Sequence, residues 1–186
     1  MPHHSNNRRS AVLLLIVVAL VCQPCIGQTS TSKEYKLKLA FLYKFALYVT
    51  PAGAKQKEIR IAVLGRSPFG KSLAAIAKRK PRGLKCVPAV YQTMANYKPA
   101  DIVFVCRGVS AAEIDLLRKK TRGQPVLIVD EDGRTFGRGG VIQFVLDASG
   151  RIKLQLNAEQ ARARKLEIDA RLLRLCTIVN VREEAR

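Results

Sequence analysis

Four apolar runs along the chain have the length and composition of buried strands, at residues 58–64, 84–91, 102–105 and 126–129. Apolar residues with helical spacing lie between them: residues 71–77 form one predicted helix, and Ser110 caps a second helix that continues to Lys119. The order strand, helix, strand, strand, helix, strand predicts an α/β sandwich. In such a fold, helices flank a mixed, largely parallel sheet.

The segment before the first strand predicts a long amphipathic helix. Thr31 and Glu34 have the spacing of a capping box, and the helix should end before Pro51. Its expected inner face consists of Leu37, Phe41, Lys44, Phe45 and Tyr48. A helix of this kind buries one face, so we expect most of its aromatic residues in the core and not on a partner-binding surface. These aromatic residues are Tyr35, Phe41, Tyr43, Phe45 and Tyr48.

Antiparallel structure is predicted nearer the C-terminus. A hairpin over residues 141–156 turns at 147–150 and follows a glycine-rich loop. Asn157 then caps a short helix, and residues 168–179 predict a helical turn followed by an extended segment. We find no repeat and no second domain, so residues 28–186 are expected to form one domain with a short charged tail.

Residues 1–27 have the three parts of a secretory signal peptide. Two arginines precede the uncharged apolar run 11–21, which is too short to span a bilayer, and small residues follow up to Gly27. We therefore predict export to the periplasm, with cleavage near Gly27. An uncleaved anchor or a buried helix is the alternative, and a lipoprotein cut before Cys22 is a weaker one.

Cleavage there would also remove both histidines, which limits the chemistry of the mature chain. A Ser/His/Asp or Cys/His nucleophile cannot be built without them, nor can a zinc site that relies on histidine. Cys86 and Cys106 lie on predicted strands that we take as neighbours, and an oxidising compartment favours a disulfide between them. Two buried thiols are the alternative. Cys176 is expected in the core, although an odd cysteine leaves intermolecular pairing open.

The net charge of the chain is +19, and it falls to about +17 when the two arginines of the leader are removed. Such a charge favours anionic partners, which include lipid headgroups, an acidic protein face and nucleic acid. The densest basic run, at residues 78–82, is typical of a solvated helix end. No aromatic residue is interleaved there to stack on bases, which argues against a nucleic-acid partner.

The stretch GRSPFGKS, residues 65–72, fits the G-x-x-x-x-G-K-[ST] pattern of phosphate-binding loops and lies between a predicted strand and a predicted helix. The later run VLIVDE could supply a magnesium-binding carboxylate. Pro68, however, has no N–H group to offer a phosphate, and export removes the usual ATP pool. We therefore expect a structural turn. A weak anion site at the start of the helix is the alternative, and its residues would be Gly65, Ser67, Gly70, Lys71 and Ser72.

Three acids, Asp130, Glu131 and Asp132, follow the last predicted parallel strand. They could bind a hard cation, but the later ligands of a calcium loop are absent. Adjacent residues on a strand point to opposite faces, which argues against a catalytic carboxylate pair. We therefore expect a solvated loop, with no metal site and no cofactor.

Four segments in a fixed order carry a resemblance to a known family. They are KLAFLYKFALYV at residues 38–49, IAVLGRSPFG at 61–70, GGVIQFVL at 139–146, and the ending from IKLQLN to RLLRL at 152–175. With these segments, the chain resembles the YfiR-like family of exported bacterial proteins from about Tyr35 to Val179.

The resemblance implies a regulatory binding protein and not an enzyme. The best understood member of the family is a periplasmic repressor of an inner-membrane diguanylate cyclase. It binds the sensor domain of the cyclase and is released by an outer-membrane lipoprotein. In this family the turn commonly has a G-x-x-P-F-G shape, so Lys71 and Ser72 would be ordinary helix residues. The cysteines here do not occupy the positions of the family's redox-responsive disulfides.

We therefore expect an exported regulator that controls a membrane-bound diguanylate cyclase or sensor kinase through its periplasmic domain. An outer-membrane protein and a second copy of the chain are further candidate partners. One alternative is a nucleotide hydrolase that uses GRSPFGKS. The other is an exported binder of small anions or acidic polymers.

Overall fold

Seven strands form one sheet, in the order β3-β2-β4-β5-β6-β7-β9. The computed structural model describes residues 27–53 and 56–180, so nearly all of the predicted signal peptide and the charged tail lie outside the described residues. The chain divides into two units at residues 33 and 34. Of the first unit only helical residues 27–33 are described, and the sheet belongs to the second.

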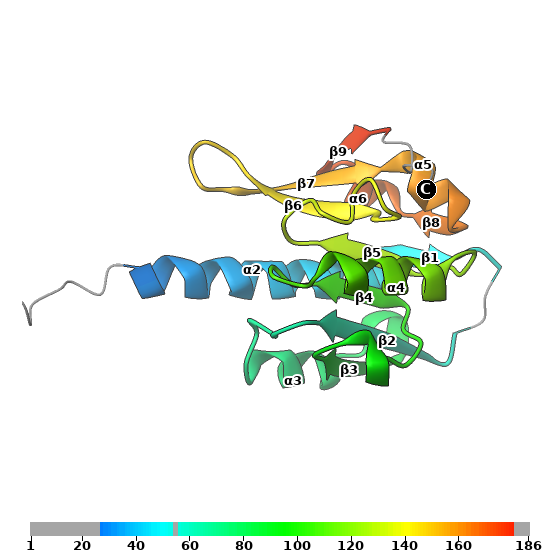
Figure 1. Ribbon diagram of the computed structural model, residues 1–186, viewed down its shortest axis with the longest axis horizontal. Helices are drawn as coiled ribbons and strands as arrows, with labels where there is room; N and C mark the ends of the chain where they lie inside the picture. Colours follow the sequence, from blue (N-terminus) through cyan, green and yellow to red (C-terminus); the bar gives the residue numbers. More distant parts are fainter. Residues whose placement is uncertain (1–26, 54–55, 181–186) are drawn as a thin grey trace, which may run out of the picture. The chain divides into compact units, whose positions relative to one another are not determined.

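The sheet combines a parallel part with an antiparallel hairpin, as predicted (Figure 1). The strands β3, β2, β4, β5 and β6 are parallel, β6 pairs with β7 in antiparallel, and β9 is parallel to β7. In spatial order the strands are β3 (Lys85–Tyr91), β2 (Glu58–Leu64), β4 (Ile102–Val105), β5 (Leu127–Asp130), β6 (Ile142–Leu146), β7 (Ile152–Asn157) and β9 (Cys176–Val179). β4 and β5 are buried at every position, because a parallel sheet is covered on both faces. The predicted fold class is confirmed.

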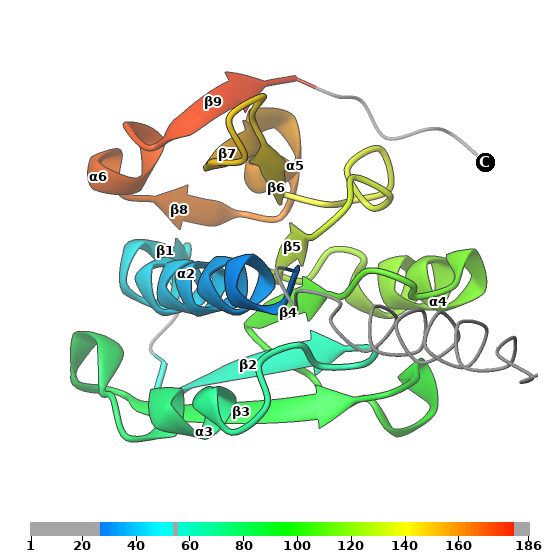
Figure 2. The same ribbon diagram turned by 90° about the vertical axis from the view of Figure 1, so that its left-hand side faces the viewer.

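From residue 34 onward, helix α2 (Gly27–Tyr48) lies on one side of the central strands, and α4 (Ala111–Thr121) lies on the opposite side (Figure 2). α3 (Ser72–Ala77) lies on the same side as α2. α5 (Ala158–Ala163) and α6 (Ala170–Leu173) lie next to the C-terminal strands. Two predicted caps are confirmed. The Ser110 hydroxyl accepts the Glu113 N–H at 3.3 Å, and the Asn157 side chain accepts the Gln160 N–H at 3.3 Å.

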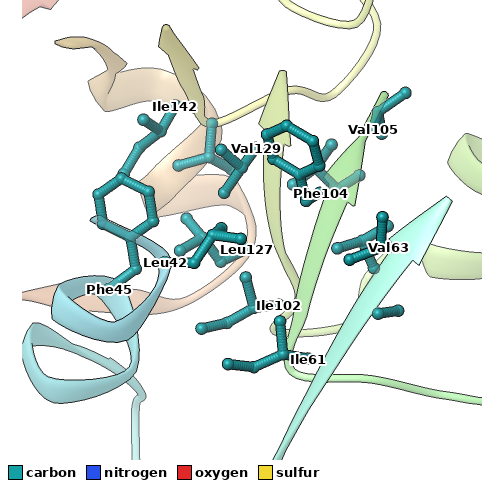
Figure 3. Close-up of a cluster of buried hydrophobic side chains, with 14 of the residues drawn as sticks. Leu42, Phe45, Ile61, Val63, Ile102, Phe104, Val105, Leu127, Val129 and Ile142 are labelled. Atoms are coloured by element: carbon teal, nitrogen blue, oxygen red, sulfur yellow. The ribbon is translucent and has the colours of Figure 1, made fainter. Parts of the chain in front are cut away.

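The main core lies between α2 and the sheet (Figure 3). Leu42 and Phe45 of α2 are fully buried against apolar side chains of the central strands. The Phe45 ring centroid lies 6.0 Å from that of Phe144 on β6. Burying a side chain of this size contributes about 1.5–3 kcal/mol, so this face anchors α2 on the sheet.

The structure corrects the predicted start and inner face of α2. The helix already begins at Gly27, so the spacing of Thr31 and Glu34 does not mark its start. Leu37 is 46% exposed and Lys44 is also exposed, whereas Lys38 is 1% exposed. The buried face therefore includes a lysine that the apolar pattern did not select.

The aromatic residues of α2 lie mostly in the core, as predicted. Phe45 is fully buried, and Tyr35, Phe41 and Tyr48 pack against the core while partly buried. Tyr43 is half-buried, and its ring lies beneath the guanidinium of Arg79, just after α3.

A small second sheet was not predicted. β1 (Val49–Pro51) pairs in antiparallel with β8 (Leu166–Ile168). Strands of three residues are too short to show a periodic pattern. Their pairing depends on two segments that meet only in the folded chain.

Candidate functional site

GRSPFGKS forms the turn between β2 and α3. Gly65 has a φ of +97°, and a Cβ at this position would lie 2.7 Å from Val109 Cγ2, so a side chain would be strained and crowded. Phe69 is 5% exposed, and its ring centroid lies 5.1 Å from that of Phe104 and 6.1 Å from that of Tyr35. Phe69 therefore packs the turn after β2 against β4 and α2.

The five candidate anion-site residues lie together on this turn, but several nearby amides are already hydrogen bonded. The Phe69 N–H donates to Ser67 Oγ at 3.4 Å, and the Ser72 N–H donates to the Phe69 carbonyl at 3.0 Å. The Leu73 N–H donates to the carbonyl of Gly70 at 3.4 Å. Three of the amides that a phosphate would use therefore already donate to groups within the protein. Anion binding at this turn stays a prediction.

Cys86 and Cys106 are far apart, and the predicted disulfide is wrong. β2 lies between their strands, so β3 and β4 are not neighbours. Cys86 pairs with Ile59 at the amino end of β2, whereas Cys106 follows Val105, the partner of Leu64 at the carboxyl end. Both thiols are free, and burial raises their pKa to about 11 and about 12. Cysteines at opposite ends of strands cannot approach within the distance that a disulfide requires.

A buried cluster of charges joins α2 to the carboxyl end of β5. Lys38 Nζ lies 2.9 Å from Glu131 Oε1 and 2.6 Å from Glu34 Oε1. The other carboxylate oxygen of Glu131 accepts the Arg107 N–H at 2.7 Å. Glu131 is 4% exposed, and Lys38 Nζ lies 4.8 Å from the centroid of the Tyr35 ring. Lys38 and Glu131 therefore neutralise one another in a place that water hardly reaches.

The expectation of a solvated acidic loop is therefore wrong for Asp130 and Glu131. Asp130 is fully buried, and its Oδ2 accepts both the N–H and the hydroxyl of Thr135. Its Oδ1 accepts the Asp132 N–H at 3.1 Å. The described residues contain no group of three or more side chains that could hold a metal ion. The two buried acids instead fix the loop that follows β5.

Burial and hydrogen bonding shift the pKa of these groups in different directions. Burial opposes the charge of Glu131, but hydrogen bonds from the Arg107 N–H, the Tyr35 hydroxyl and Lys38 lower its pKa overall. Burial raises the pKa of Asp130 despite the Thr135 hydrogen bonds. Burial and the hydrogen bond to Glu131 raise the pKa of Tyr35. Glu131 is thus ionised, and it positions residues 34–38 of α2 beside the carboxyl end of β5.

A strongly basic surface lies at one edge of the sheet. Residues 59–100 contain no aspartate or glutamate. This segment forms most of β2, α3, the 3-10 turn η1 (Pro81–Gly83), the outermost strand β3, and most of the loop to β4. We call the exposed cations of this segment the basic edge. They are Arg60, Arg66, Lys71, Lys78, Arg79, Lys80, Arg82, Lys85 and Lys98. Among the described residues, Arg60 alone of these has a carboxylate partner, Glu58, at 2.7 Å.

Two members of the basic edge connect it to α2. The Arg79 guanidinium lies 5.0 Å from the centroid of the Tyr43 ring. Arg82 Nε donates to the Ala46 carbonyl at 3.2 Å, and Arg82 Nη2 donates to Gln56 Oε1 at 2.7 Å. The basic edge is therefore attached to α2. The densest basic run, at residues 78–82, was evident in the sequence. The absence of acidic residues from all of residues 59–100 also predicts the basic edge, and this signal was overlooked.

Comparison with known proteins gives a family match for this chain. A model of the YfiR/HmsC-like family matches residues 35–177. No curated protein matches the chain. The matched range contains Lys38 and Glu131, the GRSPFGKS turn and the whole basic edge.

Replacing Lys38 by Met should lower the free energy of unfolding by about 3–5 kcal/mol, because Glu131 would stay buried without its cation. Urea denaturation at neutral pH measures the loss. The double variant Lys38→Met/Glu131→Gln should recover part of it, since the amide still accepts the Arg107 N–H but carries no charge. Lys44→Met, at an exposed position of α2, is the control and should change stability by less than about 0.5 kcal/mol. Equal losses in the two lysine variants would contradict a buried ion pair.

The stability that Glu131 contributes should depend on pH. Its folded pKa lies below the ordinary value of 4.5, so its charge stabilises the fold above that value, and the contribution is lost as pH falls through the lowered pKa. The difference in unfolding free energy between the natural chain and Glu131→Gln should be constant above about pH 5.5 and shrink at lower pH. Denaturation across this range tests the prediction. A difference that persists unchanged in acid would mean that the carboxylate charge is not its cause.

Proposed function

The chain belongs to the YfiR/HmsC-like family, and we propose that it is an exported periplasmic regulator of a membrane-bound signalling enzyme. The family is regulatory and non-catalytic, and it indicates a periplasmic role in cyclic di-GMP signalling through a partner protein. The partner in our proposal is the periplasmic domain of a diguanylate cyclase or a sensor kinase. None of the described helices has the length and apolar character needed to cross a bilayer.

The basic edge is the observation that carries this proposal. Its cations are exposed, and most of them have no carboxylate partner among the described residues, so their charge is available to another molecule. Complementary charge steers association and selects partners of opposite sign. The edge therefore suits an acidic face on the sensor domain of the partner.

Two further features at this edge suit a protein contact. Val90, on the outermost strand β3, is 41% exposed, and the edge of a sheet offers unpaired backbone groups. Tyr43 and Arg79 present an aromatic ring with a guanidinium stacked on it. Tyrosine and arginine are among the residues that contribute most to binding energy in interfaces. The edge thus combines charge with the anchors that a specific contact needs.

Reversing the charge of the basic edge should abolish regulation without affecting the fold. We expect Lys78→Glu/Arg79→Glu/Lys80→Glu to bind the solubilised cyclase at least about tenfold more weakly, with a smaller dependence on salt. In cells that lack the natural gene, this variant should fail to lower cyclic di-GMP, whereas the natural chain should lower it. Binding and nucleotide levels are measured on cells that export both forms equally.

The matched control reverses three exposed charges away from the basic edge, as Lys119→Glu/Lys153→Glu/Arg162→Glu. Its net charge equals that of the first variant, so it should retain regulation if the position of the charges decides binding. If both triple variants lose regulation equally, net charge is sufficient and the basic edge is not the binding face. If neither variant loses it, the proposed contact is wrong.

The hydrolase alternative makes a separate prediction about Lys71. In a phosphate-binding loop this lysine would reach the terminal phosphates, whereas here it is an exposed residue just before α3. We expect the purified chain and Lys71→Ala to show the same background release of phosphate from ATP with magnesium. A magnesium-dependent activity that Lys71→Ala removes would overturn the regulatory proposal in favour of hydrolysis.

A further inference from the structure

We propose that the sheet face beside the basic edge holds a binding site for a small amphipathic anion, an apolar chain or ring that carries one carboxylate. The site is a cavity of about 400 Å³ over β2 and β3. This volume falls within the range of small-molecule sites in proteins. Its walls and its charges point to this class of ligand.

The cavity lies on the face of the sheet opposite α2. Ala62 and Ala89 are register partners on β2 and β3, as are Arg60 and Val87, so all four side chains share one face. Phe69 and Phe104, which pack toward α2, belong to the other side of this part of the molecule. The floor of the cavity is thus made of small apolar side chains.

The cavity exists because no α-helix covers this part of the face. α4 lies beside the central strands (Figure 2), and the connection from β3 to β4 contains only the 3-10 turn η2 (Met94–Asn96). Glu113 and Lys120 of α4 hydrogen-bond to the backbone of Met94, which holds the connection against α4. Lys98, Pro99 and Ala100 then form the opposite wall of the cavity. With alanines below and no helix above, the space is left open.

The residues that line the cavity carry positive charge and no negative charge. Its apolar surface comes from Val87, Ala89 and Tyr91 among others, and its only ionisable cations are Arg60 and Lys98. The Tyr91 ring is held in place by the Tyr97 ring, at 5.6 Å between centroids. An apolar body would fit against the alanines and the tyrosine, and a carboxylate would meet Lys98, because Arg60 is already paired with Glu58.

The nearest acids are already engaged with other groups. Glu58 pairs with Arg60, and Asp101 accepts the Arg60 N–H at 2.7 Å and the Gln56 side-chain amide at 2.8 Å. A neighbouring cavity of about 290 Å³ shares Arg60, Pro99 and Ala100 with the first but also contains Asp101. The anionic group of a ligand is therefore expected near Lys98 in the larger cavity, away from Asp101.

Octanoate is a suitable probe, because it combines an eight-carbon chain with one carboxylate. NMR titration of the purified protein should shift the backbone amides of Ala62, Ala89, Tyr91 and Lys98, with a dissociation constant of about 0.1–1 mM for a ligand of this size. Octanol and octylammonium have the same chain without the negative charge. Octanol should bind more weakly than octanoate, and octylammonium should bind most weakly.

Two variants test the cavity and its charge separately. Ala89→Leu fills the space from a partly exposed position on the edge strand, and it should weaken octanoate binding at least about tenfold while thermal unfolding stays cooperative. Lys98→Ala should weaken binding about two- to fivefold, as expected for an exposed charge. Lys153→Ala, at an exposed position on β7, is the control and should leave binding unchanged. Glu58→Gln should strengthen binding, because it releases Arg60 from its competing carboxylate.

Three results would overturn the proposal. Equal binding of octanoate, octanol and octylammonium would show an apolar cavity without selection for anions. Octanoate binding that Ala89→Leu does not change would place the ligand elsewhere. If octanoate causes no NMR shifts at the cavity residues but the membrane partner does, this face would belong to the protein contact. The variants differ from those at residues 78–80, so this site and the proposed regulatory contact can fail independently.

Discussion

Lys38 and Glu131 hold opposite charges together between helix α2 and the carboxyl end of β5, and the placement of α2 depends on this pair. A buried charge without a partner would cost several kcal/mol, so neither residue can move away without the other. Glu34, the Arg107 N–H and the Tyr35 hydroxyl complete the hydrogen bonding of the pair. The rotation of α2 about its own axis is therefore set by an ionic contact near the middle of the helix. Leu42 and Phe45 set it further along the helix.

This rotation determines what α2 presents on its other side. With Lys38 inward, Leu37 and Lys44 face outward, and Tyr43 comes beneath Arg79. The basic edge is thereby attached to the same helix that the buried pair anchors. A regulator that binds through a charged surface needs that surface held in one geometry, because a preorganised surface loses less entropy on binding.

One segment of the chain supplies both candidate binding features. Residues 59–100 form an edge of the sheet without an acidic residue, and their connection to β4 lacks an α-helix. The first property produces a surface suited to an acidic protein, and the second leaves a cavity above the alanines of β2 and β3. Neither feature requires catalytic groups. The buried thiols, with raised pKa values, and the buried carboxylates serve the fold.

The sequence by itself determined the order and type of most elements, the Ser110 and Asn157 caps and the C-terminal hairpin. These features depend on residues a few positions apart, whose periodicity and turn chemistry are visible in the chain. Only the tertiary structure decided that Lys38 is buried, that Cys86 and Cys106 lie apart, and that β1 pairs with β8. The strands follow one another as β2, β3, β4 in the chain but lie as β3, β2, β4 in space. Which side chains meet across such a sheet is a property of long-range packing, and no local pattern contains it.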